Sequence, residues 1–126
     1  MNRVLIVLIL LPTMITISIF SMVRVHNAKD RITMLTQEVI DRIEAGDKDG
    51  ALKSANAVTD YWKNEGKILT HYTRHNLIET LSLSIARLPP LVEFDDKPAL
   101  HAEIMAIRWQ MENVYRSEAF ELRNIL

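Results

Sequence analysis

The pattern of apolar and polar positions separates one long apolar run from a series of amphipathic segments. The run begins at Val4, ends at Val23 and contains no charged residue. As a helix it would be roughly 30 Å long, which matches the hydrocarbon core of a bilayer. Its Leu, Ile, Val and Phe residues favour insertion by roughly 5 kcal/mol on a transfer scale. We therefore predict a single-pass membrane anchor at residues 1–26, in contact with the lipid bilayer through Val4 to Val23, and a separate domain at residues 27–126.

A cleaved signal peptide is the competing interpretation of this run. Signal peptides usually have a shorter apolar region that ends in a small-x-small site. The small residues near the end of the run, Ser18 and Ser21, are three positions apart, and the bulky Phe20 precedes Ser21. The sequence therefore favours an uncleaved anchor.

The orientation of the anchor is left open by its flanking charges. Arg3 precedes the run, whereas Arg24, Lys29 and Arg31 follow it. A count of Lys and Arg slightly favours a cytoplasmic domain, but domains of this length can cross a membrane largely regardless of charge. The charges alone do not decide the compartment.

Four segments after the apolar run carry apolar residues at helical spacing. Such spacing places one apolar stripe along each helix, where it can be buried against the stripes of the others. We predict that they pack against one another in water. The stripes are Ile32, Leu35, Val39 and Ile43 in the first segment; Ala51, Leu52, Ala55, Val58, Trp62 and Leu69 in the second; Leu77, Ile78, Leu81, Ile85 and Leu88 in the third; and Leu100, Ile104, Ile107, Met111 and Val114 in the fourth.

Residues with known capping preferences separate these segments. Gly46 stands at a natural C-terminal cap of the first helix, which would be about four turns long. Either Asp47 or Asp49 can cap the second helix, and either Asp95 or Asp96 can cap the fourth. The short motif DKDGAL at 47–52 recurs as DDKPAL at 95–100, each time at the start of a helix. Two stacked helical hairpins would give this echo, and so would chance repetition of capping chemistry.

The third helix must kink or stop at Pro89 and Pro90, because proline lacks an amide donor and crowds the preceding turn. No segment alternates apolar and polar residues over the length of a strand, and the chain has only three glycines. The predicted fold is all-α: an N-terminal transmembrane helix followed by a small four-helix bundle made of two helical hairpins.

Charge and cysteine content exclude several classes of function. From residue 24 onward the chain carries 14 of its 15 basic residues and all 16 acidic ones, so the part outside the apolar run has a formal charge of −2. This balance does not fit a nucleic-acid-binding protein, which concentrates cations on one face. Cysteine is absent, which excludes disulfides, thiolate nucleophiles and cysteine metal sites.

Three residues have a spacing that divalent metals use. His71, His75 and Glu79 are four positions apart, so on one helix they would share a face. The zinc-protease signature requires Glu directly after the first His, but Tyr72 stands there. We predict no metal and no cofactor, and expect one of these histidines to be partly buried and the other exposed.

Other candidate residues favour structure over chemistry. The carboxylates of Glu103, Glu112, Glu118 and Glu121 could in principle supply acid and base groups, but Glu118 and Glu121 are expected to be solvated or capping. Trp62 lies on the apolar stripe and is expected in the core. Tyr61 and the two tryptophans could form an aromatic surface, and Trp109, which lies off its stripe, is expected at the surface or an interface. The sequence contains neither a glycine-rich phosphate loop nor a nucleophile elbow.

An ordered set of features runs through the last two thirds of the chain, about residues 35–126. The features are Trp62, His75, Ile78, Glu79, SIARL at 84–88, DDKPAL at 95–100, Glu103, Glu118 and NIL at 124–126. In these features the chain resembles a family of small bacterial membrane-anchored proteins called domain of unknown function 4363. The prolines at 89–90 depart from the more polar, helix-compatible residues expected of that family, and leave open whether the third helix continues towards Asp95.

The resemblance implies a helical domain on the outer side of the membrane, in sporulating or anaerobic Gram-positive relatives, without an assigned activity. It also implies that certain polar and aromatic residues act together, as a buried polar cluster or a binding surface that joins the C-terminal tail to the bundle. These residues are Trp62, His75, Glu79, Glu103 and Asn124.

We therefore predict a non-enzymatic protein-interaction module at the cell envelope, anchored in the cell membrane with its domain outside the cytoplasm. Its partner would be an unidentified envelope protein, and nucleic acid is not expected. The alternative is a sensor or enzyme that binds a small ligand or a metal on the face formed by His71, His75 and Glu79.

Overall fold

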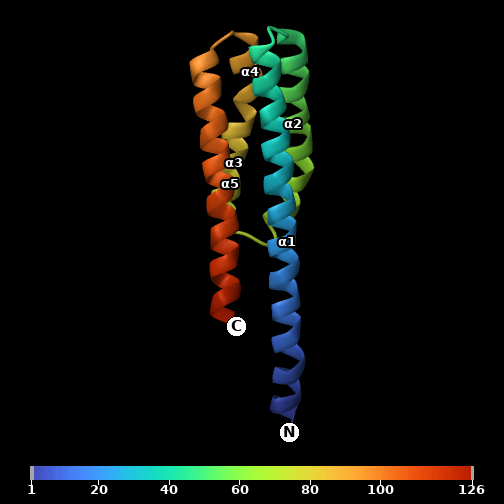
Figure 1. The fold of residues 1–126 in the computed structure, drawn as a ribbon. Coiled ribbons are helices and arrows are strands. Elements are labelled where there is room, and N and C mark those ends of the chain that lie inside the picture. The colour runs from blue at the N-terminus through green and yellow to red at the C-terminus, as the bar shows by residue number, and fades with distance from the viewer. Residues whose placement is uncertain (1, 126) are drawn as a thin grey trace.

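The protein folds almost entirely into helices (Figure 1). The structure is a computed structural model that describes residues 2–125, and no strand occurs among them. Helices α3 (His75–Ala86) and α4 (Leu88–Glu93) follow one another on the same side of the bundle and together take the place of its third helix. The chain therefore forms an antiparallel four-helix bundle (Figure 1). This confirms the predicted all-α bundle with a long apolar N-terminal helix. The helices are α1 (Asn2–Glu44), α2 (Lys48–Leu69), α3 (His75–Ala86), α4 (Leu88–Glu93) and α5 (Lys97–Ile125).

The first helix is longer than the sequence pattern indicated. The sequence pattern predicts an anchor and a separate first amphipathic helix. In the structure the two segments form one continuous helix of 43 residues. No proline or glycine lies between Pro12 and Gly46, so nothing local ends the helix earlier. The expected boundary between residues 26 and 27 therefore falls inside α1.

The predicted caps account for the ends of α1 and α2. Gly46 has a φ of 74°, and its amide donates to Ile43 O while the amide of Asp47 donates to Arg42 O, which closes α1 with a Schellman motif. The carboxylate of Asp47 then accepts the amide of Gly50 at 2.9 Å and caps α2. This hydrogen bond, followed by the one from Arg42, lowers the pKa of Asp47 below its usual value.

The other two boundaries also follow local chemistry. Asp96 caps α5 by accepting the amide of Ala99 at 3.2 Å. Pro89 and Pro90 lie in the first turn of α4, shortly after α3 ends at Ala86, so the third helix of the bundle is broken into two short helices. The predicted interruption at Pro89 and Pro90 is confirmed.

The core consists of the predicted stripes and extends beyond them. α1 packs most extensively against α2 and α5. Burying each large apolar side chain stabilises the bundle by about 1.5–3 kcal/mol. The fully buried large side chains are Val25, Ile32, Val39, Val58, Leu69, Leu81, Ile85, Leu88, Leu100, Ile104, Ile107 and Met111.

Glu118 is buried, contrary to the expectation that it is solvated or capping. Its side chain is only 6% exposed, and its Oε2 accepts a hydrogen bond of 2.8 Å from Ser21 Oγ. Position 118 continues the stripe of Met111 and Val114 at helical spacing, so α5 turns it towards α1. The contact also shows that the bundle reaches back into the apolar segment, as far as Ser21.

Glu118→Gln is expected to remove a pH dependence of stability. Burial raises the pKa of the Glu118 carboxyl above its ordinary value of 4.5; the Ser21 hydrogen bond opposes this effect, and the nearby Glu121 carboxylate adds to it. Because the folded state binds the proton more tightly than the unfolded state, stability falls as the pH rises from 4.5 through the raised pKa. The thermal stability of the glutamine variant in detergent, relative to the native chain, should therefore increase across this range. A constant difference would contradict the burial.

The N-terminal part of α1 projects away from the bundle (Figure 1). It is long and apolar enough to cross a membrane, as a membrane span or a signal sequence would be. The apolar side chains from Val4 to Leu10 are 52–64% exposed. This part of α1 contributes little to the core of the bundle.

Candidate binding groove

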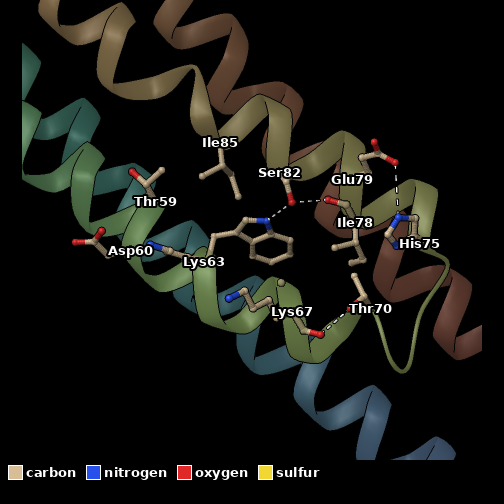
Figure 2. Close-up of a pocket in the computed structure, with 12 residues that line it drawn as sticks. Thr59, Asp60, Lys63, Lys67, Thr70, His75, Ile78, Glu79, Ser82 and Ile85 are labelled. Atoms are coloured by element: carbon tan, nitrogen blue, oxygen red, sulfur yellow. Dashed lines mark hydrogen bonds and ion pairs between the residues drawn. The ribbon is translucent and has the colours of Figure 1, made fainter.

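Trp62 on α2 reaches α3 and lines a groove between these two helices, and Figure 2 labels most of the other residues that line it. The side chain is 4% exposed, which confirms that Trp62 belongs to the core. Its indole Nε1 donates to Ser82 Oγ at 2.7 Å, and the Ser82 hydroxyl donates in turn to Ile78 O at 2.8 Å. The buried indole N–H is therefore satisfied by a hydroxyl that is itself fixed to the backbone of α3.

Gly66 allows the indole ring to lie close to the backbone of α2. A Cβ atom at this position would come within 3.1 Å of Cε2 and Nε1 of Trp62. Such a contact is tighter than packed atoms normally tolerate, so a larger residue would move either the ring or the helix. Gly66 therefore leaves space beside Trp62 without interrupting α2.

The groove has a volume of about 560 Å³ and is open to solvent along one side. Its floor is apolar, and its walls are polar side chains from α2 and α3 (Figure 2). This combination is typical of a binding site for an apolar group with polar edges. The lining residues are Thr59, Asp60, Trp62, Lys63, Gly66, Lys67, Thr70, His75, Ile78, Glu79, Ser82 and Ile85.

The charges on the two walls differ in how they are paired. On α3, His75 Nε2 lies 3.8 Å from Glu79 Oε2, and both side chains are well exposed. On α2, neither Lys63 nor Lys67 has a carboxylate oxygen within 4.0 Å among residues 2–125. Asp60, one turn from Lys63 and two turns from Lys67, is the carboxylate on that wall. The α2 wall therefore carries two cationic groups against one anionic group.

The five residues predicted to act together do not form one cluster. Trp62, His75 and Glu79 line the groove. Glu103 lies elsewhere, on the side of α5 that faces α3 and α4, with its Oε1 3.7 Å from Arg87 Nη1. Asn124 is exposed near the end of α5. The C-terminal tail is instead joined to the bundle through Glu118, because the stripe of α5 faces α1 at that position.

The metal-binding face of the alternative hypothesis does not lie on one helix. His71 lies in the turn between α2 and α3, whereas His75 begins α3, so the helical spacing on which that alternative depended does not apply. Both histidines are exposed, so the expectation that one of them is partly buried was wrong. Within residues 2–125, no group of three or more His, Cys, Asp or Glu side chains is placed to hold a metal ion.

Sequence reasoning missed most residues of the groove, including Lys63, Lys67 and Ser82. Lys63 and Lys67 are one helical turn apart beside Trp62, a local signal that could have placed all three on neighbouring faces of α2. Ser82 has no such signal, because its contact with Trp62 spans 20 residues of sequence. Only the docking of α3 onto α2 reveals it.

Comparison with known proteins gives a family but no characterised relative. A family model described as "Domain of unknown function (DUF4363)" matches residues 19–125. No curated protein and no solved structure matches the chain. The matched region includes the whole bundle together with Ser21, and it begins inside the apolar segment.

Proposed function

The chain belongs to the DUF4363 family of domains of unknown function, and we propose that it is a membrane-anchored, non-enzymatic interaction module of the cell envelope. Its groove between α2 and α3 would bind a segment of another envelope protein. The observation that carries this proposal is the open apolar groove at Trp62, with Lys63 and Lys67 on its wall, neither of which has a carboxylate partner within the described residues 2–125.

Exposed apolar side chains support anchoring in lipid. Residues such as Val4, Leu8 and Ile9 are exposed by 59–64%, and a soluble chain rarely leaves such a run in water. Packing also supports an uncleaved segment, because cleavage after Ser21 would remove the hydroxyl that binds the buried carboxyl of Glu118. A domain outside the cytoplasm is proposed from the resemblance to the family, since the flanking charges leave the orientation open.

The chemistry of the groove supports binding more than catalysis. The hydroxyl of Ser82 donates its proton to Ile78 O and accepts the indole N–H, so it is not poised as a nucleophile. Apolar surface beside unpaired lysines fits a partner segment that is apolar on one side and acidic at its edge. Asp60 would stay at the periphery of such a complex.

A single labelled position can test orientation and binding together. The chain has no cysteine, so Lys67→Cys can be modified in intact cells with a membrane-impermeant, photoreactive maleimide. We expect labelling from outside and, after illumination, one adduct of defined size. Lys53→Cys is the matched control, because Lys53 is an exposed lysine on the same helix about 21 Å away.

Three outcomes would decide against parts of the proposal. Labelling only after permeabilisation would place the domain in the cytoplasm. Labelling without an adduct, or the same adduct from position 53, would contradict binding in the groove. An adduct unaffected by an added Lys63→Glu change would exclude an acidic partner segment, since charge reversal should repel it.

A further inference from the structure

The C-terminal end of α5 runs beside the apolar segment of α1 (Figure 1). The hydrogen bond from Ser21 to Glu118 fixes the register of the two helices. Because the helices are antiparallel and each rises 1.5 Å per residue, Ile125 lies at the level of about residue 14 of α1. Ile15 and Ser18 on α1 are half-buried, as this register requires.

This register conflicts with an anchor that leaves the whole bundle in water. If every residue of α5 were outside the membrane, only residues 4–13 of the apolar segment would be free to cross it. Ten helical residues span about 15 Å, which is half of the hydrocarbon core. An anchor that crosses the bilayer over residues 4–23 must therefore carry the end of α5 into the membrane. Residue 116 then lies at the level of residue 23, where the apolar segment ends, and residue 123 lies about 10 Å deeper.

Side chains at this level are of the kinds that membrane interfaces favour. The ring of Tyr72, in the turn between α2 and α3, packs edge-on against the ring of Phe20 on α1, with 6.0 Å between the ring centroids. Phe120 is two residues beyond Glu118 and therefore lies at about the same level, 59% exposed. Arg116 and Arg123 lie one turn on either side of Phe120 on the outer face of α5, and both are exposed.

We propose that Tyr72, Arg116, Phe120 and Arg123, here called the collar, form a surface that binds the headgroups of anionic phospholipids. Aromatic rings concentrate at the interface, and the long arginine side chains can reach phosphate oxygens while their stems stay in apolar surroundings. This inference rests on the membrane anchoring in the proposed function, and it adds a second, headgroup-level contact to the anchor.

Two carboxylates near the collar limit its positive charge. Glu112 Oε1 lies 3.4 Å from Arg116 Nε, but Glu112 also binds Lys29, so the guanidinium keeps free donors for a phosphate. Glu121 is exposed on the neighbouring face of α5. With Lys29 included, three cationic groups stand against these two carboxylates, so this part of the surface keeps a formal charge of +1 and offers two guanidinium groups to the lipid.

Spin labels on the full-length chain can measure the depth of the collar. The labels would be attached to Phe120→Cys, to Met105→Cys as the control on the same helix, and to Ile9→Cys in the apolar segment. All three side chains are exposed, and the first two positions are about 22 Å apart along α5. Power saturation with oxygen and with a water-soluble nickel chelate would be compared in vesicles of phosphatidylcholine and phosphatidylglycerol.

We expect three different environments. The label at position 9 should be accessible to oxygen and not to nickel, the label at 105 to nickel, and the label at 120 should be intermediate. If position 120 behaves like 105 while position 9 is in lipid, the collar is wrong and the anchor stands. If position 9 is exposed to nickel, the anchor of the proposed function fails, and the collar fails with it.

The role of anionic headgroups has its own test. Removing phosphatidylglycerol should increase nickel accessibility at position 120, and the double change Arg116→Glu with Arg123→Glu should abolish that difference. Both changes are on exposed side chains, so the fold should persist. A depth at position 120 that is the same in both lipids would overturn recognition of anionic headgroups.

Discussion

Replacing Trp62 with alanine is expected to lower the free energy of unfolding by about 3 kcal/mol or more. The indole is 4% exposed and fills the space between α2 and α3, so its removal leaves a cavity that Gly66 cannot help to close. It also leaves the hydroxyl of Ser82 without its indole donor. For a domain of this size, the loss corresponds to a fall in melting temperature of roughly 10–20 °C.

Trp109→Ala is the matched control for this experiment. It makes the same chemical change on a side chain that is 66% exposed, so its effect should be within about 0.5 kcal/mol. Thermal unfolding of the full chain in detergent, followed by circular dichroism, compares the two variants. If Trp62→Ala shifts the melt by only a degree or two, Trp62 is not a core residue.

Local chemistry made much of the fold predictable from the sequence. The cap at Asp47 depends on residues three positions apart, and the break at Pro89 and Pro90 depends on the prolines themselves. The apolar stripes predicted the core because a helix buries one face whatever its partner is. These features required no knowledge of which helices would meet.

Features that depend on pairs of helices were not predictable in this way. Glu118 lies on the stripe of α5, but a carboxylate at such a position is usually solvated, and only the approach of Ser21 explains its burial. The groove likewise exists because α3 meets α2 through Trp62 and Ser82, which are 20 residues apart. His71 and His75 have helical spacing in the sequence, but the turn between α2 and α3 separates them.

The junction between the apolar segment and the bundle also could not be predicted from the sequence. The sequence marks where charges begin, after Val23, but it does not show that packing begins earlier, at Ser21. A single helix through this point couples the orientation of the bundle to that of the apolar segment. A flexible joint at residues 26–27 would instead let the two move independently.

Asn27→Pro distinguishes these two possibilities and is expected to lower the free energy of unfolding by about 3 kcal/mol or more. Proline at this position removes an amide donor and crowds the carbonyl of Val23 one turn earlier. Asn27 is exposed, so the cost comes from the backbone and not from lost packing. The break would also displace Val25 and Ser21 from α5, which should weaken the contact with Glu118.

Two controls separate a broken helix from a general effect of the substitution. Asn27→Ala keeps the helix and should leave the melt unchanged or slightly raised. Lys48→Pro places the same residue at the first position of α2, where the amide has no helical partner, and the exposed ion pair of Lys48 with Asp95 contributes little. If the melting temperature of Asn27→Pro equals that of Lys48→Pro, α1 is flexible near residue 27. The bundle is then connected to its apolar segment by a flexible link and not by a continuous helix.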